Sequence, residues 1–360
     1  MKKYSSLLLL ILVAHCSFSQ DESNELTLRT YVELYYGLNL GYLGTDQKNM
    51  PDFQFNHHRH NEFNLNLGLL NIAYENDRVR SSLGMMVGTY VYQNMIDEPD
   101  VLKNIYQASV GVKLSSSHNF WLDVGVHEAH TGFEGAIGKD QNFMTRSILA
   151  ENSPYFSTGA VLSYISNNEA LEIRLFVLNG WQNIVRDPLM KSPAVGHQVL
   201  YKPNEKWTFN SSSYIGEEVV DQQLRNRLFH NFHAIYDQES WNAILGVDYG
   251  AQHNFSSTWY TWQGIIAECR FNLFKGFRLG FRSEYFNDSN YAVIPIQSGE
   301  GFNNLGFTLG IDYAIKEEVL IRFETKYYAG EEDYYIRGNE WSNELWYIGA
   351  ALCFDFSKKL

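Results

Sequence analysis

Polar and apolar residues alternate with a period of two along most of this 360-residue chain. In residues 28–42, for example, Leu34 falls on an apolar parity and Glu33 on a polar one. Successive side chains of a β-strand point to opposite faces, so each such segment has one face suited to lipid and one suited to water. About sixteen segments reach the roughly 9–11 residues that a tilted membrane strand needs. Clear examples are residues 277–285, 305–313 and 319–327.

The connections between these segments alternate in length. Short polar links such as residues 75–78 and 315–318 are separated by longer ones. The longer links fall near residues 43–60, 93–104, 130–156, 179–195, 217–225, 253–258, 288–302 and 331–342. A soluble β-sandwich also alternates, but its connections need not sort into two length classes. We therefore predict an all-β fold, a transmembrane antiparallel β-barrel of about 16 strands with short periplasmic turns and long extracellular loops.

The two ends of the chain indicate export and insertion into a membrane. Residues 1–19 have a basic start, a short apolar run and small residues before the expected cleavage point, which predicts a signal peptide. We expect a short periplasmic segment at 20–27, the barrel at 28–356 and a tail at 357–360. The final strand ends in alternating apolar and aromatic residues, which resembles the signal read by barrel-assembly machinery. A net charge of −13 argues against a nucleic-acid partner.

The motif "HEAHTG" at residues 127–132 resembles a metalloprotease motif only superficially. A zinc-binding helix needs histidines at i and i+4, whereas His127 and His130 are at i and i+3 in a segment of period two. We interpret the motif as the exit of a strand into the loop 130–156. This loop either folds into the lumen, where it would narrow a channel, or caps its outer mouth.

Charged residues on the polar parity are the candidate pore-lining residues, because charge on the lipid face is costly. If the loop folds inward, its carboxylates would face wall cations and set a transverse field. The wall candidates are Glu33, Arg174, Asp248, Arg278, Arg282, Glu284, Arg322, Glu324 and Lys326, and the loop candidates are Glu134, Asp140 and Glu151.

Several motifs around this loop resemble those of a known family. They are Arg146-Ser147, Pro154 with Phe156, Thr158-Gly159 and Asn179-Gly180-Trp181. Together they resemble the putative β-barrel porin-2 family, the OmpL-like porins of Gram-negative bacteria. The resemblance implies an outer-membrane channel and gives no catalytic residues.

Three histidines, His57, His58 and His60, lie close together in the first long loop and are weak candidates for a Zn²⁺ or Cu²⁺ site. The alternative is an ordinary polar loop, and we expect no cofactor.

Three functions remain open. The leading one is a passive porin for small hydrophilic solutes, since sixteen strands enclose water. The second is a substrate-specific channel with an aromatic track at Tyr35, Phe176 and Phe286. The third is an outer-membrane hydrolase, for which no nucleophile–base spacing can be found. The expected partners are outer-membrane lipid, small hydrophilic solutes and the assembly machinery, with a homotrimer as a further hypothesis.

Overall fold

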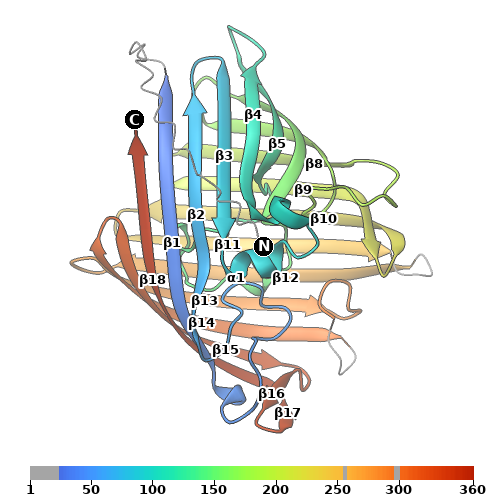
Figure 1. Cartoon of the computed structure of the whole chain (residues 1–360), viewed down its shortest axis with the longest axis vertical. Helices are drawn as coiled ribbons and strands as arrows, with labels where there is room; N and C mark the ends of the chain where they lie inside the picture. Colours follow the sequence, from blue (N-terminus) through green and yellow to red (C-terminus); the bar gives the residue numbers. More distant parts are fainter. Residues whose placement is uncertain (1–23, 254–257, 296–300) are drawn as a thin grey trace, which may run out of the picture.

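The computed structural model describes residues 24–253, 258–295 and 301–360. Within them, sixteen antiparallel strands close into a barrel, and a separate hairpin of two short strands lies in the last long loop (Figure 1). The predicted signal peptide, 1–19, lies outside the described residues. Among the described residues, no helix is long and apolar enough to cross a membrane.

Each barrel strand pairs with its neighbours in sequence, except that β18 pairs with both β15 and β1 and so closes the sheet. The first eight barrel strands are β1 (Glu25–Asn39), β2 (Phe63–Glu75), β3 (Val79–Val87), β4 (Ile105–Lys113), β5 (Asn119–Glu128), β6 (Phe156–Ile165), β7 (Leu171–Leu178) and β8 (Ala194–Asn204). The others are β9 (Trp207–Val220), β10 (Gln223–Gln238), β11 (Trp241–His253), β12 (Trp259–Asn272), β13 (Phe277–Asp288), β14 (Phe302–Lys316), β15 (Val319–Gly330) and β18 (Glu344–Lys359).

The remaining elements all lie in the longer connections. They are η1 (Leu40–Tyr42), α1 (Thr89–Asn94), η2 (Asp100–Asn104), η3 (Gly138–Asp140), α2 (Ile148–Glu151), β16 (Tyr335–Arg337) and β17 (Glu340–Ser342). Strands β3 to β7 have at most 10 residues each, whereas β9 to β12 have at least 13. The barrel wall is therefore uneven in height.

The alternation places side chains as the sequence predicts. Leu34, Phe281 and Phe323 are about half exposed on the outer face, while Glu33 and Arg322 on the inner face are fully buried. The exterior is apolar and exposed, and the interior is polar and buried. This is the reverse of the arrangement in a soluble protein, and it suits an environment of lipid. The polar inner face is the surface on which any channel must be built.

Four boundaries differ from the expectation. The barrel starts at Glu25 and ends at Lys359, so parts of the expected segment 20–27 and tail 357–360 pair in the sheet. Tyr42 does not continue the first strand but is buried in η1. The long link expected near 217–225 is a two-residue turn of Asp221 and Gln222, both with positive φ, which suits a tight hairpin.

Candidate functional site

The connection between β5 and β6, residues 129–155, corresponds to the predicted loop 130–156. Every residue from Phe143 to Glu151 is buried. Most of the side chains that hold it come from the inner faces of β12, β13 and β15, so this β5–β6 connection lies inside the barrel against that wall. These three strands follow the connection by more than a hundred residues in the sequence.

Arg322 on β15 binds this connection through several hydrogen bonds. Its guanidinium donates to both carboxylate oxygens of Asp312, at 2.8 and 2.9 Å. Its remaining N–H groups donate at 2.6–3.2 Å to the carbonyls of Gly138, Gln141, Asn142 and Phe143. The side chain is fully buried, so Arg322 fixes the backbone of the connection and is covered by it.

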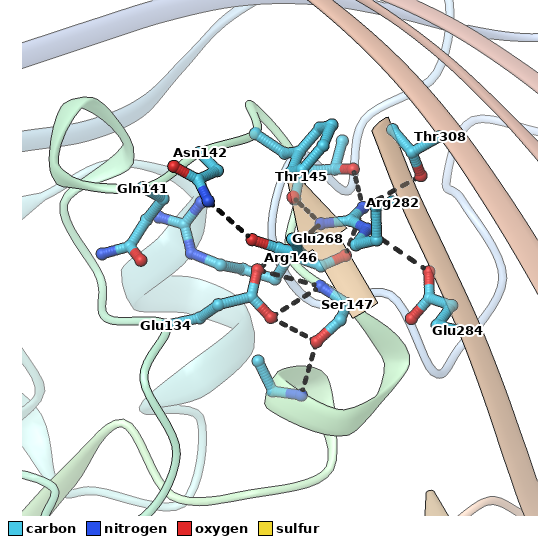
Figure 2. A network of polar contacts seen from close by, with 12 residues as sticks. Glu134, Gln141, Asn142, Thr145, Arg146, Ser147, Glu268, Arg282, Glu284 and Thr308 are labelled. Atoms are coloured by element: carbon cyan, nitrogen blue, oxygen red, sulfur yellow. Dashed lines mark hydrogen bonds and ion pairs between the residues drawn. The ribbon is translucent and has the colours of Figure 1, made fainter. Parts of the chain in front are cut away.

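Arg282 and Lys326 bind the next turn of the connection in the same way. Arg282 donates to the carbonyl of Thr145 at 3.0 Å, and Lys326 donates to the carbonyl of Arg146 at 2.9 Å. Figure 2 shows Arg282 among the carboxylates of Glu134, Glu268 and Glu284, at 3.5–3.6 Å. These cations neutralise buried carboxylates and bind carbonyls, which is what a buried charge requires.

Wall carboxylates bind the N–H groups of the connection. Glu324 accepts from the backbone N–H of Met144 at 2.8 Å, and Glu284 accepts from that of Ile148 at 2.6 Å. Within the connection, Glu134 accepts from the N–H and the hydroxyl of Ser147, the N-cap of α2 (Figure 2). The wall thus provides hydrogen-bond partners for both the backbone N–H groups and the carbonyls of the connection.

Glycines on the inner wall make room for the apolar side chains of the connection. A Cβ at Gly264 would lie 2.7 Å from Cγ of Leu149, and one at Gly280 or Gly310 would lie 3.0–3.1 Å from the ring of Phe143. Real Cβ atoms essentially never show a contact as short as the one at Gly264, so a larger residue there would force Leu149 to move. A run of inward glycines on adjacent strands is the sequence signal for such close packing, and this signal was missed.

The other two predicted loop carboxylates also have partners. Asp140 accepts from Arg29 on β1, at 2.9 Å to each oxygen. Glu151 accepts from the backbone N–H groups of Phe55 and Asn56, both at 3.1 Å, and so ties the β1–β2 connection to the β5–β6 connection. Burial raises the pKa of Glu151 to about 7.

The three clustered histidines are directed to separate partners. His57 Nε2 lies 3.3 Å from Glu33, His58 Nδ1 lies 2.7 Å from the carbonyl of Gln54, and His60 Nδ1 accepts from the N–H of Asn39 at 3.1 Å. In the described part of the chain, no three His, Cys, Asp or Glu side chains are grouped to hold a metal ion. The arrangement gives the weak metal hypothesis no support.

The remaining candidates are spread over the wall. Arg174 pairs with Glu172 at 2.6 Å and is partly exposed, whereas Asp248 is buried and accepts from Asn231 at 2.6 Å. Arg278 forms no ion pair or hydrogen bond with any residue that the structure describes. The wall charges therefore do not converge on one ring.

Open space remains beside the strands that the β5–β6 connection does not cover. At the short-turn end, a cavity of about 910 Å³ is lined by residues that include Arg80, Trp121 and Glu172. A second cavity, of about 330 Å³ with Ser109 and Asp123, shares Arg80 with the first, and a third, of about 310 Å³, lies beside the connection. Glu128 at the end of β5 lines both of these inner cavities. We call this series the lateral path.

Two further cavities, of about 700 and 720 Å³, lie at the long-loop end. They share no lining residue with the lateral path. Tyr155 lines the inner end of the path, and Ser153 lines the outer cavity. Between them, Tyr155 packs edge to face against Tyr90 of α1, with ring centroids 5.7 Å apart. This aromatic pair separates the two sets of cavities.

A closed sixteen-stranded barrel with a lipid-facing exterior, a polar interior and an inward-folded connection defines the class of outer-membrane porins. A sequence profile of the Putative beta-barrel porin-2, OmpL-like family matches residues 25–356, and the chain belongs to this family. It is a porin-like channel of the outer membrane of a Gram-negative bacterium.

Solved porins share the fold at very low sequence identity. An anion-selective porin from Comamonas acidovorans has a TM-score of 0.60 at 8% identity, covering 92% of this chain and 100% of that one. The channel DcaP of Acinetobacter baumannii gives 0.60 at 9%, with 94% and 99% covered. OmpF of Salmonella typhi, solved with daunomycin, gives 0.56 at 10%, with 94% and 99% covered. A search of curated proteins gave no significant match.

Proposed function

We propose that small hydrophilic solutes diffuse passively through this barrel by way of the outer cavities and the lateral path, and that the β5–β6 connection and the Tyr90–Tyr155 contact form the constriction between them. The observation that carries the proposal is that the β5–β6 connection fills one side of the lumen and leaves cavities on the other. The connection makes most of its side-chain bonds to the wall of β12–β15, while the cavities follow β2–β8.

This proposal divides the predicted pore-lining set. Arg174 faces the lateral path, while Arg282, Glu284, Arg322, Glu324 and Lys326 act as anchors of the constriction. The loop carboxylates position the connection more than they contact solute. A transverse field across the lumen would then come from the groups left facing the path.

The family and the fold favour a channel over an enzyme. We propose outer-membrane lipid as the solvent of the apolar exterior and assembly machinery as a transient partner during insertion. A homotrimer remains a proposal as well, supported by a trimer form of OmpT from Vibrio cholerae with a TM-score of 0.59.

The substrate-specific alternative has less support. Tyr35, Phe176 and Phe286 are each at most 4% exposed, which gives a passing solute little aromatic surface.

Site-directed modification in planar bilayers tests the path. In a background of Cys269→Ser and Cys353→Ala, Ser109→Cys places a thiol in the middle cavity, and Thr308→Cys places one beneath the anchored connection. We expect a charged methanethiosulfonate reagent to lower the single-channel conductance of the first variant and not of the second. Equal effects on both, or no conductance from the folded protein, would contradict the proposal.

A further inference from the structure

Two ion pairs that line the lateral path cancel their own charges, and this inference rests on that path being the one solutes use. Arg80 binds both oxygens of Asp123, at 2.6 and 2.5 Å. Arg174 binds Glu172 at 2.6 Å. An ion pair presents a dipole to a solute a few ångströms away and not a net charge, so these four groups contribute little selectivity.

The carboxylates of the β5–β6 connection are compensated too. Glu134 faces Arg282 and the N-terminus of α2. Asp140 belongs to a cluster with Arg29, Lys139 and Asp355, joined at 2.9–3.4 Å, in which two acids meet two bases. Glu134 and Asp140, two of the three acidic residues that the sequence singled out in this loop, therefore leave almost no net charge facing solute.

Two exposed carboxylates beside the inner cavities form no ion pair with a described residue, Glu75 and Glu128. Glu75 also lines the wide 910 Å³ cavity, whereas Glu128 lines both the 330 and the 310 Å³ cavity and accepts a hydrogen bond from the hydroxyl of Tyr106. Tyrosine is neutral at physiological pH. None of the described Lys, Arg or His side chains lies within 4.0 Å of its carboxylate, so its negative charge is uncompensated at the inner part of the path.

We infer that Glu128 is the residue that sets charge selectivity, and that it makes the channel prefer small hydrophilic cations, such as inorganic monovalent ions and small amines. A fixed carboxylate beside a narrow aqueous path raises the local concentration of cations and lowers that of anions. Tyr106 holds the carboxylate in place without cancelling its charge.

Reversal potentials in a KCl gradient across a planar bilayer test this inference. We expect the full-length channel to be more permeable to K⁺ than to Cl⁻. Glu128→Gln should lower the permeability ratio by up to about 25-fold, because one unit charge at about 4 Å in water raises the local concentration of cations and lowers that of anions by about fivefold each. Glu128→Lys should favour Cl⁻. Glu205→Gln is the matched control, because it removes the same charge at the wide end of the path and should change the ratio little.

The outcomes separate this inference from the proposed function. Channels that conduct normally but keep their selectivity in Glu128→Gln would overturn the role of Glu128 and leave the path intact. An equal shift in Glu205→Gln would also overturn it, since the whole acidic surface would then set the preference. A folded wild-type protein without conductance would overturn the proposed function itself.

Discussion

Replacing Arg322 by alanine should release the β5–β6 connection from the wall. The substitution leaves the buried carboxylate of Asp312 without its cation and four backbone carbonyls without their donor. Removing one partner of a buried ion pair costs about 3–5 kcal/mol, because the other charge stays buried and unpaired. The bonds to the carbonyls are lost at the same time and are not counted separately, since they share one side chain.

Single-channel recording can detect the release of the connection from the wall. We expect Arg322→Ala to conduct through a wider lumen, with a higher mean conductance and frequent switching between levels as the connection moves. The heat-modification midpoint of the folded barrel in detergent should fall as well. Arg322→Lys should be intermediate, because an ammonium keeps the charge but cannot bond Asp312 through two parallel N–H groups.

Arg278→Ala is the control, since it removes a cation on β13, two strands away, that bonds no part of the connection. It should leave conductance levels and the midpoint unchanged. If Arg322→Ala behaves like Arg278→Ala, the connection is held by other contacts and the anchoring argument fails.

Three further predictions concern the same interior. Gly264→Val should displace Leu149 and lower the heat-modification midpoint, and Leu149→Ala should recover part of the loss in the double variant. Tyr90→Ala should join the two sets of cavities and raise conductance in bilayers, whereas Tyr90→Phe, which keeps the ring against Tyr155, should not. Burial raises the pKa of Glu151 to about 7 while the β5–β6 connection is bound to the wall. The bound connection therefore holds a proton that the released one lacks between about pH 7 and 4.5. Its binding gains stability as the pH falls through this range, by about 3 kcal/mol at most. Level switching should therefore decrease toward acid pH, and Glu151→Gln should abolish that dependence.

The wall of the barrel could be predicted because its pattern is local. The face that a side chain takes depends only on its parity within one strand, so Leu34 outward and Glu33 inward follow from a few residues. The turn at Asp221 and Gln222 was missed because neither is the glycine or asparagine that usually marks positive φ. The sequence around it was therefore read as a long loop.

The interior could be predicted only in part, since its contacts are not local. Parity places Arg322 inside the barrel, but its partner Gly138 is 184 residues away, and nothing in either segment specifies the pairing. An inward arginine that lines water and one that holds a loop carbonyl have the same sequence pattern. Glu128 was treated as a strand exit, because its exposure and its position between cavities depend on how the whole connection folds.

Selectivity therefore has to be argued from pairing and not from composition or fold. The porin from Comamonas acidovorans is anion-selective and shares this architecture at 8% identity, so the barrel itself permits more than one preference. In this chain, Arg282, Arg322 and Lys326 are bound to carbonyls or matched to carboxylates, and their fields are largely cancelled before they reach open space. A residue such as Glu128, whose only bonded partner among the described residues is a neutral hydroxyl, can then outweigh many buried charges.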